Sequence, residues 1–165
     1  MGAGKTTVGK QLATALGKSF HDTDQEIERR TGVKISLIFE IEGEAGFRAR
    51  EAQVVDQLTQ LPNVVLATGG GAVLAGASRG HLARRGLVIY LHGQPQDLWQ
   101  RTRYDKSRPL LQNTDAMEKL KSLYQQRDPL YREIADIVVD TGHQRVRTLL
   151  LQLLPEVRQR CNLSA

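Results

Sequence analysis

The sequence predicts an α/β domain with a mostly parallel sheet and helices on both of its faces. Short apolar runs alternate with amphipathic segments along all 165 residues, which is the pattern of strands that alternate with helices. This length is typical of one domain and is sufficient for a buried core. The sequence contains no repeat, low-complexity tract or long linker, so we expect residues 1–165 to form a single domain.

Turn and cap residues set the boundaries of the expected elements. Gly17 and Gly32 are placed to end the first two helices and Pro62 a later one, because these residue types commonly terminate helices. The expected helices cover residues 5–16, 25–31, 35–42, 44–60, 77–85, 95–103, 115–134 and 144–160. The expected strands cover residues 19–21, 63–67, 87–91 and 137–139. Residues 104–114 are polar and turn-rich, with the length and composition of a lid.

Composition argues against a membrane protein and against a nucleic-acid partner. No segment approaches the run of about 18 apolar residues that a spanning helix needs, and the first residues lack the apolar core of a signal peptide. The net charge of +5 is spread along the chain, and aromatic residues make up only 5%, so no stacking platform for single strands is expected. The single cysteine, Cys161, cannot form an internal disulfide, which fits a reducing, cytoplasmic location.

A glycine-rich segment opens the first expected helix. Met1-Gly2-Ala3-Gly4-Lys5-Thr6-Thr7 matches the end of the phosphate-loop motif G-x-x-x-x-G-K-[ST], whose first glycine would fall before Met1. Glycines let backbone N–H groups approach phosphate oxygens, and the following helix adds the positive end of its dipole. We expect Lys5 to reach the β- and γ-phosphates of ATP and the Thr6 hydroxyl to bind Mg²⁺. The segment also fits the looser N-myristoylation pattern, but an acylated Gly2 would disable such a loop.

Asp22 and Asp24 follow the first expected strand, two residues apart. Side chains at this spacing on a strand share a face, and ligands of open α/β sheets bind at the carboxyl ends of strands. One carboxylate can serve the metal, directly or through water, and the other can hold a substrate hydroxyl and accept its proton. A pair of capping residues for the next helix explains these two residues equally well when they are considered alone.

Two further segments predict contact with a substrate. Arg48 lies on an expected helix, where its planar guanidinium can grip a substrate carboxylate with Glu51 to orient it. A solvated ion pair between Arg48 and Glu51 is the alternative. The run Gly69-Gly70-Gly71 directly follows an expected strand. Three glycines are costly in conformational entropy, so the run indicates that a ligand approaches the backbone closely. A bare loop is the alternative.

Two arginines in the second half of the chain lie in short motifs that contain proline and leucine. Arg108 begins the run R-P-L-L inside residues 104–114, and a lid arginine can neutralise charge on a transferring phosphoryl group. Arg127 begins the run R-D-P-L-Y late on a long helix, where Pro129 is expected to kink or restart that helix. By itself Arg127 indicates no function, because most such arginines are solvated.

Taken together, these motifs resemble those of the shikimate kinase family. They are, in order, G-x-G-K-T-T, D-T-D, F-R-x-x-E, G-G-G, R-P-L-L and R-x-P-L-Y. Each is weak alone, but the ordered set at the family's spacings covers essentially the whole chain. The resemblance implies a three-layer P-loop kinase fold with a mostly parallel central sheet, helices on both faces and a mobile lid. It also implies that ATP and shikimate give shikimate 3-phosphate and ADP in aromatic amino-acid synthesis, catalysed by a cytoplasmic monomer.

The resemblance also implies roles for individual residues. Gly2, Ala3, Gly4, Lys5, Thr6 and Thr7 would cradle the phosphates, and Thr6 with Asp22 would serve Mg²⁺. Asp24 would hold the shikimate hydroxyls and act as base. Arg48 and Arg127 would clamp the carboxylate, and Gly69, Gly70 and Gly71 would line the same pocket. Arg108 would close from the lid onto ATP. Arg101 would flank the adenine, and Gln144, in the segment Thr141–Arg145, would close its other side, although the family's usual proline is absent there.

One family feature has no counterpart in this sequence. The family begins with a strand that precedes the phosphate loop and lies inside the sheet, whereas here the loop starts at Met1. Without that strand, two neighbouring strands would lose a partner and apolar surface would be exposed. We therefore expect the first, inner strand of the sheet to be missing, and Met1 to be an internal methionine of a protein that starts upstream.

Three other functions remain open from the sequence. The nearest is another small P-loop kinase, for gluconate or a nucleoside monophosphate, although Asp24, Arg48 and Arg127 fit a carboxylate better than a nucleobase. A non-catalytic nucleotide-binding module would bind ATP without turnover. A nucleic-acid binder would lose affinity steeply as salt rises.

Overall fold

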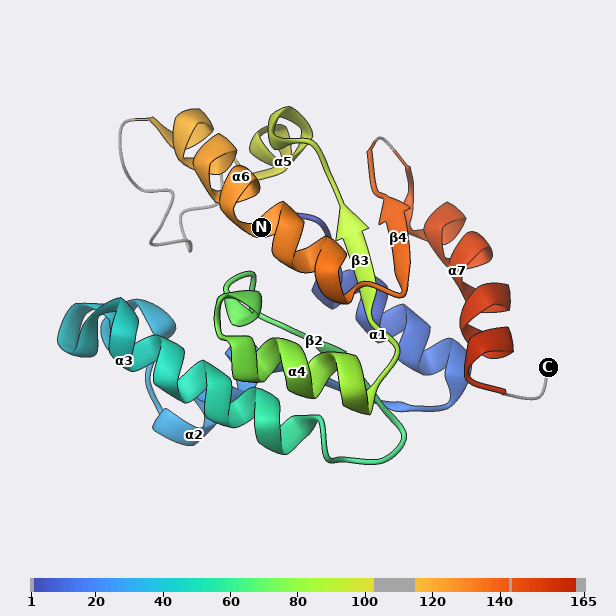
Figure 1. Cartoon of the computed structure of the whole chain (residues 1–165), viewed down its shortest axis with the longest axis horizontal. Coiled ribbons are helices and arrows are strands. Elements are labelled where there is room, and N and C mark those ends of the chain that lie inside the picture. Colours follow the sequence, from blue (N-terminus) through green and yellow to red (C-terminus); the bar gives the residue numbers. More distant parts are fainter. Residues whose placement is uncertain (1, 103–114, 143, 163–165) are drawn as a thin grey trace.

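The computed structural model describes residues 2–102, 115–142 and 144–162, most of which lie in alternating helices and strands. The elements, in chain order, are α1 (Lys5–Leu16), β1 (Ser19–Asp22), α2 (Thr23–Thr31), α3 (Ile35–Leu58), β2 (Val64–Ala67), the 3₁₀ helix η1 (Ala72–Leu74), α4 (Gly76–Arg85), β3 (Ile89–His92), α5 (Pro95–Thr102), α6 (Ala116–Ile134), β4 (Ile137–Asp140) and α7 (Val146–Arg160) (Figure 1). Every expected helix and strand is confirmed, with small shifts at the boundaries, and only η1 was not expected.

Local chemistry explains where the helices end. Gly17 and Gly32 follow α1 and α2 with φ of 63° and 71°, left-handed values that glycine adopts without strain. Gly43, at φ 69°, interrupts α3, so the two helices expected over residues 35–42 and 44–60 form one element with a kink. By contrast, α6 runs through Pro129 to Ile134 without a restart.

The four strands form two parallel pairs. Asp22 of β1 lies opposite Ala67 of β2, and His92 of β3 lies opposite Asp140 of β4. The parallel direction of the strands is confirmed. Within the described ranges, no strand joins β2 to β3, so the pairs remain separate sheets. This gap agrees with the expectation that an inner strand is missing.

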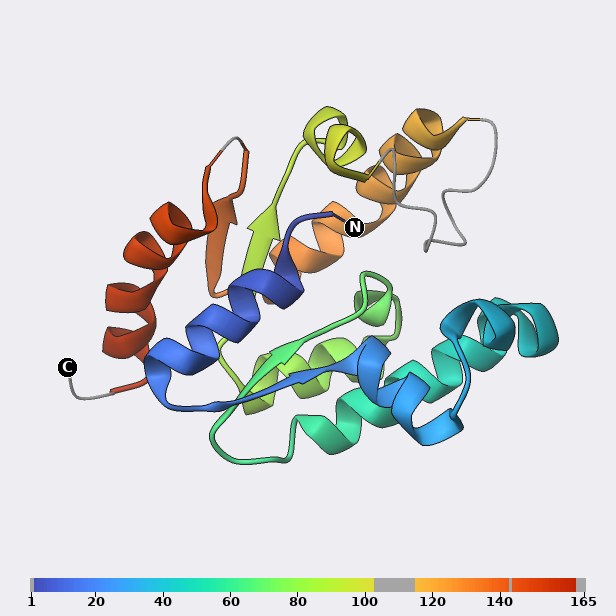
Figure 2. The ribbon, with the colours of Figure 1, turned by 180° about the vertical axis from the view of Figure 1, so that it is seen from behind.

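Helices cover both faces of the strand pairs, which confirms the predicted three-layer arrangement (Figures 1 and 2). On one face α1 and α7 lie side by side, and Val8 and Leu153 pack there with Ile137 of β4. On the other face α4 contacts both α3 and α6. A second apolar cluster joins α2 to α3 through Ile27 and Phe47.

None of the helices in the described part of the chain is long and apolar enough to cross a membrane.

Candidate active site

The segment before α1 forms a loop that depends on glycine. Gly2 and Gly4 have φ of 73° and 84°, in the left-handed region that favours glycine. A Cβ at Gly2 would lie 2.6 Å from the Thr102 side chain of α5, so there is also no room for a side chain at this position. Because α1 begins at Lys5, the free backbone N–H groups of its first turn and the positive end of its dipole come directly after this loop. This loop and helix form a geometry suited to an anion such as phosphate.

Thr6 and Asp22 meet beside this loop. The Thr6 hydroxyl donates to Asp22 Oδ2 over 2.8 Å and so joins the first turn of α1 to the end of β1. Asp22 also caps α2, because its Oδ1 accepts hydrogen bonds from the backbone N–H groups of Asp24 and Gln25. The capping interpretation is therefore correct for Asp22, and it leaves Oδ2 beside the hydroxyl. These two oxygen donors fit a hard cation such as Mg²⁺, which keeps several water ligands of its own.

Asp24 lies in a different setting from the one expected. The strand ends at Asp22 and Asp24 belongs to the first turn of α2, so the expectation that both carboxylates share a strand face is wrong. The cause is the cap, since Asp22 starts the helix at the next residue. Burial first, and then the charges of Asp22 and Glu51, raise the pKa of Asp24 from 3.8 to about 6. A carboxylate with this pKa is a stronger base than an ordinary aspartate.

Arg48 and Glu51 form a partly buried ion pair on α3. Arg48 Nη1 donates to Glu51 Oε2 over 2.6 Å, and Glu51 is only 2% exposed. Burial raises the pKa of Glu51, and the Arg48 guanidinium opposes that rise. A Cβ at Gly71 would collide with the Arg48 guanidinium. The pair is therefore not the solvated ion pair considered from the sequence, because Glu51 holds Arg48 against the glycine run.

The glycine run is held between α2 and α6. The backbone N–H of Gly69 donates to Thr23 Oγ1 over 2.8 Å. The carbonyl of Gly70 accepts from Arg127 Nη1 over 3.0 Å and from Tyr131 Oη over 2.5 Å. Arg127 is 5% exposed, so it is not the solvated arginine that its place in the sequence suggested.

Polar atoms from α2, α3 and α6 converge around this run. A side chain at Gly69 would collide with Glu51 Oε1 and Asp24 Oδ1, and Arg127 is near enough to lower the pKa of Glu51. One buried atom on each of Asp24, Glu51 and Arg127 has no hydrogen-bond partner within the described residues. Such atoms are costly when left unpaired, so their gathering at a bare backbone indicates a site for a polar ligand.

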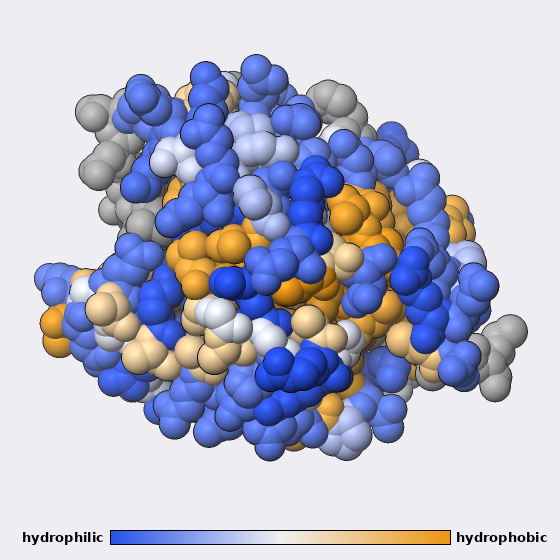
Figure 3. Space-filling view, in the orientation of Figure 1, coloured by the Kyte–Doolittle hydropathy of each residue, from blue (hydrophilic) through white to orange (hydrophobic). Residues whose placement is uncertain are grey.

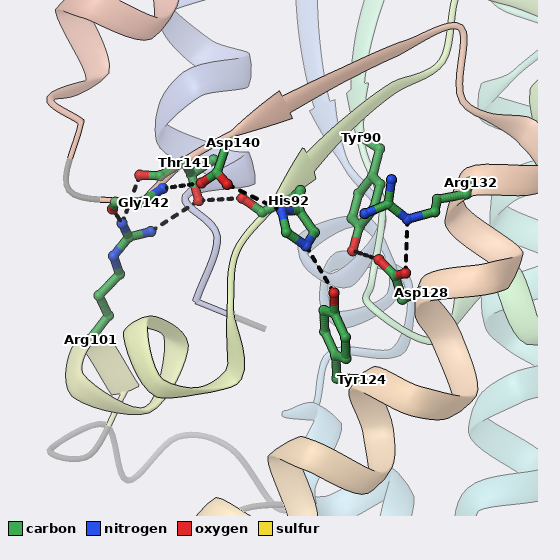
Figure 4. A network of polar contacts seen from close by, with 9 residues as sticks. All are labelled: Tyr90, His92, Arg101, Tyr124, Asp128, Arg132, Asp140, Thr141 and Gly142. Atoms are coloured by element: carbon green, nitrogen blue, oxygen red, sulfur yellow. Dashed lines mark hydrogen bonds and ion pairs between the residues drawn. The ribbon is translucent and has the colours of Figure 1, made fainter.

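A pocket of about 550 Å³ lies beside the phosphate loop. Gly2, Ala3, Gly4 and Thr7 line it together with Arg101 and Gln144. Arg101 Nη2 donates to the Thr141 carbonyl over 2.8 Å and to the Gly142 carbonyl, and Nη1 donates to the Thr141 hydroxyl over 3.3 Å (Figure 4). The fold thus brings Arg101 and Gln144 to the loop, as the resemblance implies for the adenine side.

Sequence reasoning missed a polar network around His92, which adjoins the pocket beside the phosphate loop through Thr141 (Figure 4). His92 Nε2 lies 3.0 Å from Tyr124 Oη of α6, and His92 Nδ1 lies 3.5 Å from Asp140 Oδ2. The carbonyl of His92 accepts from Thr141 Oγ1 over 2.8 Å. No motif marked these residues, because their partners come from elements far apart in the chain. Tyr131 had one available signal, its place in the R-x-P-L-Y segment.

Lys5 and Arg108 are the other two predicted catalytic residues. Lys5 is the first residue of α1, near enough to Asp24 for its charge to lower the pKa of that carboxyl. Arg108 and the predicted lid over residues 104–114 lie outside the described residues, so their roles remain predictions.

Relatives of known sequence agree on one family. The family model described as shikimate kinase matches residues 1–158. A shikimate kinase of Nitrosococcus oceani is 54% identical over 159 residues, covering 96% of this chain and 84% of that protein. A shikimate kinase of Thiobacillus denitrificans is 63% identical over 146 residues, covering 88% of this chain and 80% of that protein.

Solved structures agree as well. The shikimate kinase of Acinetobacter baumannii in complex with shikimate has a TM-score of 0.94 and 48% identity, covering 97% of this chain and 89% of that one. The shikimate kinase of Aquifex aeolicus has a TM-score of 0.84 and 31% identity, covering 99% and 95% of the two chains. Because motifs, fold and both comparisons point the same way, this chain belongs to the shikimate kinase family.

Proposed function

We propose that this protein transfers the γ-phosphoryl group of ATP to a hydroxyl of shikimate, giving shikimate 3-phosphate and ADP in aromatic amino-acid synthesis. The observation that carries the proposal is the place of Asp24, a carboxyl with a raised pKa close to Lys5 of the phosphate loop and to Arg48. The names of the relatives, and the Acinetobacter baumannii structure with shikimate bound, support the same substrate.

Arg48 and Arg127 are proposed to bind the carboxylate of shikimate from two sides. Glu51 holds Arg48 in place, and the Gly70 carbonyl holds one nitrogen of Arg127 while its Nε has no partner within the described residues. Two guanidinium groups on one carboxylate give strong, oriented hydrogen bonds. They also give selectivity, because a ligand without that group leaves buried charges unpaired.

The nucleotide is proposed to lie across the loop of residues 2–7. Its phosphates would meet the backbone N–H groups of this loop and the first turn of α1, and its base would enter the pocket of about 550 Å³ that Arg101 and Gln144 line. Mg²⁺ bound with ATP would neutralise charge on the phosphates. Thr6 and Asp22 are the residues that would hold this ion, since their oxygens lie 2.8 Å apart beside the loop.

Asp24 is proposed to orient the substrate hydroxyl and take its proton. As that proton moves to the carboxylate, the hydroxyl oxygen bonds to the γ-phosphorus and the bond to the bridging oxygen of ADP breaks. A pKa of about 6 leaves Asp24 ionised at neutral pH and still basic enough to share a proton. Lys5 would stabilise charge on the phosphates, and Arg108 would do so from a closed lid that also excludes water.

The same proposal places the protein in the cytoplasm as a monomer that binds small molecules. The support is the dispersed charge, the scarcity of aromatic residues and the lone Cys161, which favour neither a nucleic-acid partner nor a disulfide framework. Sedimentation at several concentrations tests the monomer, and a concentration-dependent increase in mass would contradict it.

The test is ADP release from Mg·ATP with shikimate, gluconate or a nucleoside monophosphate as acceptor. Of the three acceptors, we expect only shikimate to be phosphorylated. Asp24→Asn should lower kcat about 10²–10⁴-fold, the range for removing a general base. Turnover with gluconate or with a nucleotide instead would assign the site to another small-molecule kinase. A folded protein that binds ATP and turns over none of these acceptors would also overturn the proposal.

A further inference from the structure

Glu44 is a second carboxylate on the guanidinium of Arg48. Its Oε1 accepts from Arg48 Nε over 3.2 Å and from Arg48 Nη2 over 3.0 Å, while Glu51 Oε2 accepts from Nη1 over 2.6 Å. All three nitrogens of the guanidinium therefore donate to carboxylates of the protein itself. Ion pairs four residues apart are common on helix surfaces and stabilise a helix only weakly. This one differs because its arginine is proposed to bind the substrate.

These contacts decide how a ligand can approach Arg48. A carboxylate accepts two parallel hydrogen bonds from a guanidinium along one of two edges, Nε with Nη2 or Nη1 with Nη2. Glu44 occupies the first edge, so a ligand carboxylate that binds there must displace it. At the second edge a ligand meets nitrogens already shared with Glu44 and Glu51, and both of these carboxylates repel it.

Solvent exposure identifies the glutamate that can give way. The side chain of Glu51 is 2% exposed, whereas that of Glu44 is 51% exposed. A buried carboxylate that loses its partner keeps an uncompensated charge, which is costly, but a half-exposed one is rehydrated at little cost. The face of α3 seen in Figure 3 is mostly hydrophilic, as suits a carboxylate that exchanges an arginine for water. Glu44 is therefore the exchangeable partner of Arg48.

A kink in α3 fixes the position of Glu44. Gly43 interrupts the helix with φ of 69° and ψ of −176°. Arg50 donates across the interruption to both oxygens of Glu42, over 2.8 Å from Nε and 2.7 Å from Nη2. Glu44 is the first residue after the interruption, and Arg48 follows one helical turn later on the same face. The contact is thus built into the local geometry of the helix.

We infer that Glu44 is a built-in competitor for the carboxylate of the substrate. It occupies the Nε–Nη2 edge of Arg48 in the free enzyme, and the substrate carboxylate displaces it on binding. Exchange of one carboxylate for another keeps the charge of Arg48 compensated in both states. It also favours anionic ligands, because a neutral ligand cannot take the place of Glu44. The inference rests on the proposed function, since it takes this ligand group to be the carboxylate of shikimate.

The strength of the contact sets the size of the effect. Ion pairs with this degree of exposure favour the paired state by about twofold to fivefold. A ligand that binds only when the pair is open has its apparent Kd raised by about the same factor. Removal of the Glu44 carboxylate should therefore tighten the binding of shikimate, whereas loss of a residue that helps to hold the ligand would weaken it.

The test measures Kd for shikimate by titration calorimetry without nucleotide, so that no turnover takes place. Glu44→Ala removes the competing group, and Glu44→Gln removes its charge but keeps an oxygen that can accept from Arg48. Glu40→Gln is the matched control, because Glu40 is an exposed glutamate of the same helix and the hydrogen bonds of Arg48 go to Glu44 and Glu51. Turnover of shikimate is measured separately for each protein.

Glu44→Ala should lower Kd about twofold to fivefold, Glu44→Gln should lower it less, and Glu40→Gln should leave it unchanged. A higher Kd for Glu44→Ala would mean that Glu44 orients Arg48 for the substrate, and an equal fall for Glu40→Gln would mean a general effect of charge. Either result, or an unchanged Kd for Glu44→Ala in a protein that phosphorylates shikimate, would overturn this inference alone. Absence of shikimate binding by both the parent and Glu44→Ala would overturn the proposed function with it.

Discussion

Asp24 is predicted to lower the stability of the protein while serving its activity, and Asp24→Asn separates the two. The carboxyl has its pKa raised from 3.8 to about 6, first by burial and then by Asp22 and Glu51. A raised pKa means that the folded state disfavours the ionised form. The difference of about 2 pKa units corresponds to about 3 kcal/mol at pH values above 6. The asparagine amide must also find partners, so we expect a net gain of about 1–3 kcal/mol, or roughly 3–10 °C in Tm.

The pH dependence fixes the sign of this effect. Thermal unfolding of both proteins is measured at pH 7.5 and at pH 4, together with kcat at pH 7.5. The gain should be full above the folded pKa of about 6 and should vanish toward pH 4, where Asp24 is protonated in the folded state. Asp56→Asn is the matched control on α3. The hydrogen bond from Arg85 lowers the pKa of Asp56, so this variant should lose stability at pH 7.5 instead.

Two results would refute this reasoning. One is an Asp24→Asn variant that is no more stable than the parent at pH 7.5. The other is a gain that is equally large at pH 4, because a packing effect would persist there and a charge effect would not. Retention of full kcat would separately remove Asp24 from the proposed chemistry.

Three further predictions concern the binding of shikimate beside the glycine run and of Mg²⁺ beside the phosphate loop. Arg127→Lys keeps the charge but loses the planar fork, so KM for shikimate should rise about tenfold or more in steady-state kinetics; an equal rise in KM for ATP would contradict this. Tyr131→Phe removes the hydroxyl that donates to the Gly70 carbonyl over 2.5 Å. KM for shikimate should then rise about threefold to tenfold with little change in kcat, and an unchanged KM would show that Arg127 suffices to hold Gly70. Thr6→Val should raise the Mg²⁺ concentration for half-maximal rate about tenfold or more, whereas Thr6→Ser should not; equal Mg²⁺ titrations for both variants would exclude Thr6 as a ligand.

Local sequence signals predicted the elements well because local chemistry decides them. Gly17 and Gly32 end helices by adopting left-handed backbone conformations, and Gly43 divides α3 at the point where two helices were expected. The restart considered at Pro129 depended on local signals too, but α6 continues past this residue to Ile134. Packing of α6 against α4 and α5 is a tertiary effect that such signals do not contain.

The site was predictable in its membership and less so in its geometry. The phosphate loop and the glycine run follow from backbone chemistry that glycine alone permits. The strand face expected to carry both Asp22 and Asp24 was wrong, because Asp22 caps a helix that begins at Thr23 and so places Asp24 on α2. The contacts of Tyr131 with Gly70 and of His92 with Tyr124 were missed, since each joins elements that are distant in the chain.

The most direct test of phosphoryl transfer to a carboxylate-bearing alcohol is the mass of the product. Shikimate and its methyl ester are each incubated with Mg·ATP and the protein. We predict that shikimate gains the mass of one phosphoryl group with one ADP released for each product molecule, and that the ester remains unmodified because Arg48 and Arg127 find no carboxylate. Unmodified shikimate in the presence of a folded, ATP-binding protein, or equal phosphorylation of the ester, would contradict the account.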